Sequence, residues 1–170
     1  MKRPVPINPQ GSQESVWDYP RPPRLEPSSK HIEIICGGIK IADSHHAFRV
    51  LETSHPPVYY IPSSDVKLEF LKLADGSSYC EWKGEAGYYD LQIGTLLVRQ
   101  VAWFYPQPSQ SFAPIKDHLA FYASRVTLLG GDGCFVDSEQ VIPQPGEFYG
   151  GWITSDVVGP FKGESNSSAW

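Results

Sequence analysis

Two groups of side chains in the sequence could do chemistry: a cysteine followed three residues later by a lysine, and a set of aromatic residues. Cys80 is a candidate catalytic nucleophile, and Lys83 could favour its thiolate across a predicted turn. No histidine stands at a spacing that marks a Cys/His pair, and a buried, inert cysteine is the commoner outcome. Catalysis at Cys80 is therefore one hypothesis among several.

The aromatic residues suggest binding. The chain has five tryptophans and nine tyrosines, and an aromatic box suits flat heterocycles such as nucleobases, or a cation. Charged side chains nearby would orient such a ligand. The same aromatic residues could equally fill a thin β core. The candidate ligand-binding residues are Trp82, Trp103, Tyr60, Tyr105, Glu52, Arg49, Lys83 and Asp43.

The cysteines and histidines do not predict a metal site. Three cysteines lie far apart with no Cys-x-x-Cys pair, which excludes zinc held by thiolate pairs and indicates reduced thiols. His45 and His46 would point to opposite faces of a strand. We expect neither a metal nor another cofactor.

The charge and hydropathy of the sequence argue against some classes of binding partner. The net charge is -5, and no Lys/Arg stripe is present to neutralise a run of phosphates, which argues against double-stranded nucleic acid. No apolar window reaches the ~18 residues of a membrane span, and no apolar region follows the basic start MKRPVPINPQ. We expect a cytoplasmic protein whose partner is a small molecule or a peptide.

The pattern of short runs predicts an all-β chain with little or no helix. Sixteen prolines disfavour long helices, and alternating segments such as "AFRVLET" are typical of strands. Gly37-Gly38 and Asp75-Gly76 each predict a hairpin turn, and Gly94 predicts a break between two further strands.

A motif that occurs twice in the chain suggests a partial internal duplication. Trp-x-Tyr-Pro-x-Pro occurs at 17–22 and again at 103–108, and each copy is followed in the same order by further shared motifs. The last of these, Lys-Gly-Glu, places Gly84 and Gly163 at turns where a positive φ is expected. Chance is the alternative explanation. A duplication would give the fold internal pseudo-symmetry.

Three segments follow from these patterns: a Pro-rich arm (1–30), a core (31–126), and a C-terminal extension (127–170) that forms a partial repeat on the same domain. Trp17, Tyr19 and Leu25 could hold the arm on its own chain. A polyproline segment could instead dock on a sister subunit, giving a homodimer.

Several ordered blocks resemble the domain of unknown function 427 family: "IADSHHAFRVLET", "PPVYYIPSSDV", "YCEWKGEAGYY" and "VAWFYPQP…IKDHLAFY". The resemblance covers roughly residues 32–126, and "FYGGWITSDVVGPFKG" resembles an extension found in some members. The family pattern is Cys-Pro-x-Lys-Gly-x-Ala, and Glu81 stands in place of its proline.

The resemblance implies a β-tent of short antiparallel sheets, similar to the cereblon ligand-binding domain, and no established activity. Some members carry a nucleotidyltransferase-like label, but the sequence lacks a Gly-Ser followed by paired Asp-x-Asp. The zinc that related folds hold between Cys-x-x-Cys pairs is not expected here. Three functions remain open: a small-molecule or peptide binding module, an enzyme using Cys80 with Lys83 and Glu52 or a nucleotidyltransferase-like activity, and a protein-interaction module.

Overall fold

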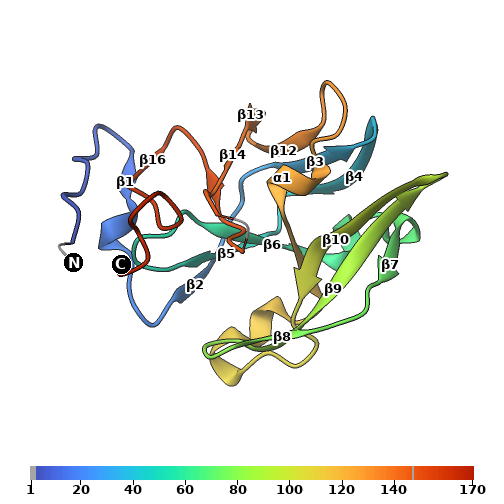
Figure 1. Ribbon diagram of the computed structural model, residues 1–170, viewed down its shortest axis with the longest axis horizontal. Helices are drawn as coiled ribbons and strands as arrows, with labels where there is room; N and C mark the ends of the chain where they lie inside the picture. The colour runs from blue at the N-terminus through green and yellow to red at the C-terminus, as the bar shows by residue number, and fades with distance from the viewer. Residues whose placement is uncertain (1–2, 147) are drawn as a thin grey trace.

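The computed structural model describes residues 3–146 and 148–170, and the chain is built mainly from short strands (Figure 1). Only short helical segments interrupt them, and none of the described helices is long and apolar enough to cross a membrane. The prediction of an all-β fold is confirmed.

An antiparallel sheet of eight strands forms the body of the fold. Seven of these strands form one continuous path of paired neighbours. The eighth, β8, pairs with a different part of β9 from the part that pairs with β7. In spatial order they are β2 (Arg24–Pro27), β5 (Phe48–Leu51), β6 (Val58–Pro62), β11 (His118–Phe121), β10 (Leu96–Phe104), β9 (Gly84–Ile93), β7 (Leu71–Leu73) and β8 (Ser78–Cys80).

The remaining strands form one four-stranded sheet and two short ladders. The four-stranded sheet, seen above the larger one in Figure 1, comprises β13 (Glu139–Gln140), β12 (Gly133–Val136), β3 (Ile32–Cys36) and β4 (Ile39–Ser44). The ladders join β1 (Glu14–Ser15) to β16 (Val157–Val158), and β14 (Ile142–Pro143) to β15 (Trp152–Ile153). The helical segments are α1 (Ala123–Val126) and the 3-10 turns η1 (Val16–Asp18), η2 (Ser63–Asp65), η3 (Leu68–Phe70) and η4 (Gln110–Ile115).

Both faces of the large sheet are buried at its centre, because alternate residues of the central strands enter two separate cores. Tyr59 and Ile61 of β6 belong to the core that also includes the apolar residues of the four-stranded sheet, whereas Tyr60 belongs to a second core. Ala102 and Trp103 of β10 separate in the same way. The second core contains most of the aromatic residues that the sequence singled out.

Two of the three predicted turns are confirmed and one is wrong. Gly37 and Gly38 have φ of +60° and +77° and join β3 to β4, and Gly94 lies between β9 and β10. The strands on either side of Asp75-Gly76, however, do not pair with each other. Both β7 and β8 pair with β9, so the segment between them is an irregularity in one edge of the sheet. The long strand β9 offers a partner for each, which the local turn signal does not reveal.

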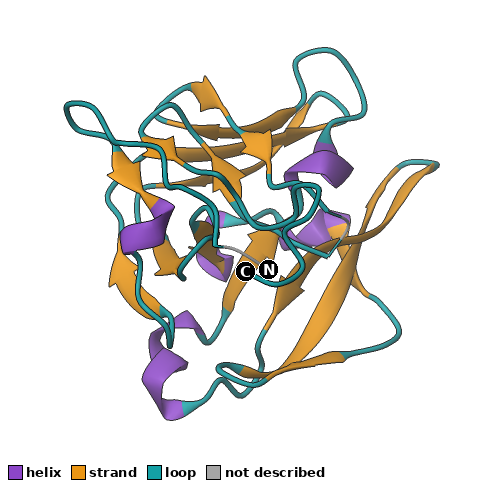
Figure 2. Cartoon of the chain, turned by 60° about the vertical axis from the view of Figure 1, so that its left-hand side comes forward, coloured by secondary structure: helices purple, strands orange, loops and turns teal. Residues whose placement is uncertain are grey.

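The proline-rich arm packs against its own chain. Trp17 and Tyr19 are buried beside Leu51 and Val157, and the indole Nε1 of Trp17 donates a hydrogen bond to the carbonyl oxygen of Pro160 (2.9 Å). Further along the arm, β2 pairs with β5. The described part of the arm thus adds the edge strand β2 to the large sheet, one of the strands drawn in orange in Figure 2.

The two copies of the proposed repeat are not alike in every part. Trp17 lies on η1, whereas Trp103 lies on strand β10. Gly84 and Gly163 do share the expected backbone, with φ of +109° and +105°. The internal duplication therefore stays a prediction.

A group of ion pairs fastens the arm to the large sheet. Arg49 on β5 is only 13% exposed, and its guanidinium donates two hydrogen bonds to Glu14 (2.9 Å each) and one to Glu26 (2.5 Å). The hydrogen bonds from Arg49 hold the pKa of Glu14 below its ordinary value, although partial burial opposes this. Charge-assisted bidentate pairs of this kind are the stronger class of hydrogen bond.

Replacing Glu14 with Gln should lower the free energy of unfolding at pH 7 by about 1 kcal/mol. Because the folded-state pKa of Glu14 is depressed, its contribution is present above the ordinary value of 4.5 and disappears as the pH falls through the lower, folded-state pKa. Urea unfolding of the wild type and E14Q from pH 7 to pH 3 should therefore converge at low pH. The exposed Glu85→Gln is the control; a gap for E14Q that is constant over this range would contradict the prediction.

Gly163 packs more tightly than a side chain permits. An added Cβ would lie 1.8 Å from the carbonyl oxygen of Pro145, at a backbone φ of +105°. Gly76 is a matched control, because its φ is +92° and no atom lies within 4 Å of its added Cβ. Gly76→Ala should cost about 1–2 kcal/mol through backbone strain alone. Gly163→Ala should cost clearly more, and equal losses in chemical denaturation would refute the packing argument.

Candidate functional site

A small pocket lies on the face of the large sheet that is turned away from the four-stranded sheet. Its volume is about 180 Å³. Most of its lining comes from β6, β10 and β9 and from the residues that directly follow or precede them, and β11 lies between β6 and β10 in the sheet. The lining residues are Val58, Tyr60, Ser78, Lys83, Ala86, Tyr88, Trp103, Tyr105, Tyr122 and Phe148.

The aromatic walls contact one another at angles rather than in parallel stacks. The rings of Trp103 and Tyr122 are 4.5 Å apart, and the ring of Tyr60 is 6.2 Å from those of both Trp103 and Tyr105. Trp103 Nε1 donates to the hydroxyl oxygen of Tyr60 (3.3 Å). Ala86, a small buried residue, lies among these large side chains and leaves space between them.

Tyr60, Tyr105 and Tyr122 of the pocket are neutral hydrogen-bond donors at neutral pH. Burial raises the pKa of Tyr60 and of Tyr105 above the ordinary value, and it raises the pKa of Tyr122 to about 12. A hydroxyl that remains protonated can donate to a ligand oxygen. The pocket therefore combines aromatic surface with several hydroxyl groups.

Lys83 is the charged side chain in the described lining, and it is 9% exposed. Its Nζ lies 5.8 Å from the ring centre of Tyr105 and 5.5 Å from that of Phe112. Burial lowers the pKa of Lys83, whereas its interactions with Tyr60 and Cys80, including a hydrogen bond with the Cys80 thiol, raise it, and the net shift is upward. Lys83 is consequently an ammonium at neutral pH.

The turn that carries Lys83 is fixed by a neighbouring loop. Ser109 donates its backbone N–H to the carbonyl of Lys83 (3.0 Å) and its hydroxyl to the carbonyl of Trp82 (2.6 Å). Gly84 follows with a positive φ and begins β9. The turn forms with Glu81 in place of the proline of the family pattern.

Cys80 is the last residue of β8 and packs against the aromatic core that surrounds the pocket. It is half-buried, whereas Cys36 and Cys134 are buried in the other core. Burial raises the pKa of Cys36 to about 11 and that of Cys134 well above its ordinary value. Cys80 is thus the thiol with access to solvent.

Four of the predicted binding residues meet at this pocket and four lie elsewhere. Tyr60, Trp103, Tyr105 and Lys83 all line it. The four that do not are held in other places: Trp82 packs at the edge of the aromatic core, Arg49 pairs with Glu14, Glu52 pairs with Arg21 (3.4 Å), and Asp43 lies on the outer surface of β4.

Asp43 belongs to a separate polar cluster with His31 and Glu33, whose ligand atoms lie within 4.8 Å of one another. The ammonium of Lys40 lies 2.8 Å from Glu33 and 3.2 Å from Asp43, so a cationic side chain already pairs with both carboxylates. His31 also stacks on His45, with ring centres 4.4 Å apart.

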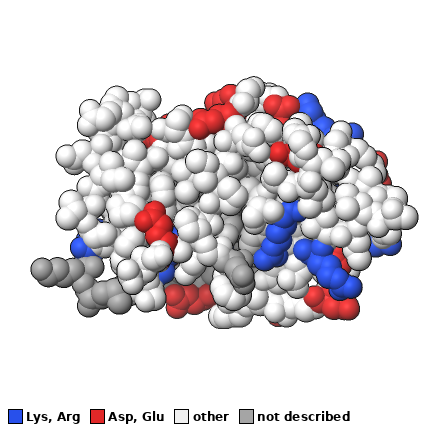
Figure 3. All heavy atoms as spheres, turned by 45° about the horizontal axis from the view of Figure 1, so that its top comes forward, with Lys and Arg blue, Asp and Glu red and all other residues white. Residues whose placement is uncertain are grey.

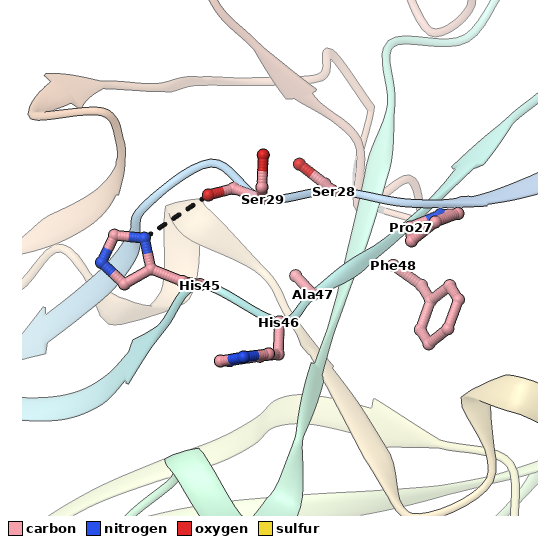
Figure 4. Close-up of a pocket in the computed structure, with 7 residues that line it drawn as sticks. All are labelled: Pro27, Ser28, Ser29, His45, His46, Ala47 and Phe48. Carbon is pink, nitrogen blue, oxygen red and sulfur yellow. Dashed lines mark hydrogen bonds between the residues drawn. The ribbon is translucent and has the colours of Figure 1, made fainter.

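His45 and His46 border a second, more open hollow of about 560 Å³ (Figure 4). The two imidazole rings leave the chain in different directions, and His45 Nδ1 lies 3.4 Å from the carbonyl oxygen of Ser29. Elsewhere on the surface, the face drawn in Figure 3 carries scattered charges of both signs. We take the aromatic pocket as the candidate site, because four of the predicted binding residues meet there.

The sequence analysis missed three aromatic residues of the lining: Tyr88, Tyr122 and Phe148. Tyr88 is the register partner of Trp103, so the alternation of the β9–β10 hairpin could have placed both on one face. No comparable signal exists for Phe148, which the distant C-terminal segment brings to the pocket.

The fold and the pocket define an all-β protein with an aromatic site built around one buried lysine. A family model described as domain of unknown function (DUF427) matches residues 24–131, which is more than half of the chain. The chain belongs to this family, as its motifs indicate. No match to curated proteins was found.

The three thiols should differ in reactivity. In the folded protein at pH 7.5, iodoacetamide should label Cys80 and leave Cys36 and Cys134 unmodified, because a buried thiol is protected from the reagent. Intact-mass spectrometry should show a single adduct that is absent in C80S. Two or three adducts in the native state would contradict this arrangement.

Proposed function

We propose that the protein is a binding module for a small flat molecule and that the pocket of Tyr60, Lys83, Trp103 and Tyr105 is its site. The observation that carries this proposal is the convergence of these residues, from separate segments of the chain, on one hollow. Small-molecule sites commonly combine aromatic side chains with polar groups at fixed positions, and the surface of this pocket is more polar than apolar.

The size of the pocket limits the ligand. A cavity of about 150 Å³ accepts benzene, so the 180 Å³ found here fits one six-membered ring with small substituents. Pockets for drug-sized ligands are about 300–1,000 Å³. A whole nucleotide would therefore project into solvent.

Catalysis at Cys80 is a second candidate, favoured by the position of this thiol beside the aromatic core and by its electrostatic interaction with Lys83. The nucleotidyltransferase-like activity has less support. None of the described residues that line the pocket is an aspartate or glutamate, the side chains that would hold a metal–nucleotide complex.

Thermal unfolding in the presence of single-ring compounds, both neutral and charged, tests the binding proposal. A ligand at 100 times its Kd should add about 2.7 kcal/mol, which corresponds to roughly 5–10 °C for a chain of this size. Trp103→Phe should reduce the shift, because the indole forms a wall of the pocket.

Trp82→Phe provides the matched control, since Trp82 lies at the edge of the same core but outside the lining. Equal losses of binding in the two variants would move the site away from this pocket. No shift with any compound of the panel would count against the proposal.

A further inference from the structure

The charge of Lys83 has no acidic partner among the residues that the structure describes. Each of the ion pairs found in residues 3–146 and 148–170 uses other cations. Glu52 acts on Lys83 from beyond ion-pair distance, but its carboxylate is paired with Arg21 at 3.4 Å and lies 3.8 Å from His55.

Lys83 is largely buried, and the thiol of Cys80, a weak acceptor, is its side-chain hydrogen-bond partner, so an anionic counter-ion would stabilise the ammonium further. The rings of Tyr105 and Phe112 offset part of its lost hydration through cation–π attraction at 5.8 and 5.5 Å. They do not supply a hydrogen-bond acceptor. An anionic oxygen in the pocket would supply one and would also gain a charge-assisted hydrogen bond.

The other polar groups of the pocket suit the same anion. The hydroxyl oxygen of Tyr60 accepts from Trp103, and the hydroxyls of Tyr60 and Tyr105 also bond to each other, which leaves one of their two protons to donate to a ligand. Tyr105 and Tyr122 keep their protons at neutral pH, because burial raises the pKa of each. Donors therefore accompany the ammonium.

We propose that the natural ligand of this pocket is a monocyclic carboxylate, an acid on a single flat ring, whose carboxylate pairs with Lys83 while the ring lies among Trp103, Tyr60 and Tyr122. This deepens the proposed binding function and rests on it. A monocarboxylate fits better than a phosphate ester, because a phosphate carries close to two negative charges and the described lining offers one cation.

Isothermal titration calorimetry at pH 7 with benzoate and with benzamide, its neutral analogue of similar shape, tests the charge requirement in the unmodified protein. Benzoate should bind at least tenfold more tightly than benzamide. Lys83→Met keeps the length of the side chain and removes the charge, so this preference for benzoate over benzamide should disappear. Lys72→Met on the exposed edge strand β7 should leave both affinities unchanged.

The outcomes separate the two proposals. Equal binding of benzoate and benzamide would overturn the carboxylate ligand and leave the binding module intact. Tighter binding of phenyl phosphate than of benzoate would overturn the carboxylate in favour of a phosphate. If no ring compound binds at millimolar concentration, both proposals fail. The wild-type comparisons do not depend on the variants, so the inference remains testable even if K83M unfolds.

Discussion

The antiparallel pairing of β6, β11, β10 and β9 is the constraint on which the rest of the structure depends. Because the central parts of these strands are buried on both faces, their alternate residues enter one of two cores, and a slip of one residue would exchange the two sets of side chains. Tyr59 and Ile61 stabilise the contact with the four-stranded sheet, while Tyr60 between them reaches the pocket. The same register thus determines both the stability of the fold and the composition of the site.

Much of this arrangement was accessible from the sequence. Alternating apolar residues and the Gly37-Gly38 turn predicted strands and a hairpin that the structure contains. The Asp75-Gly76 turn was misread, because a local turn signal cannot show that β9 is long enough to pair with strands on both sides of it. Pairing partners distant in sequence are decided by tertiary packing rather than by propensity.

The candidate site was predictable to a similar extent. Residue type alone identified Tyr60, Trp103, Tyr105 and Lys83, since large aromatic residues and a lysine beside a turn are visible in the sequence. The sequence did not reveal the ion pairs of Arg49 and Glu52, because their partners Glu14 and Arg21 belong to the N-terminal arm. Phe148 enters the pocket from outside the segment that the family model matches.

Hydrogen bonds and a ring contact connect the rim of the pocket with the C-terminal segment and with the N-terminal arm. Gln144 fastens the loop that carries Phe148, accepting a hydrogen bond from the backbone of Gly151 and donating one to the carbonyl of Lys162. The segment that follows meets the N-terminal arm, where the ring of Trp170 contacts that of Trp17 at 5.5 Å. Local opening of the C-terminal segment would therefore loosen both the contact with Trp17 and the loop that carries Phe148, two places that are far apart in the sequence.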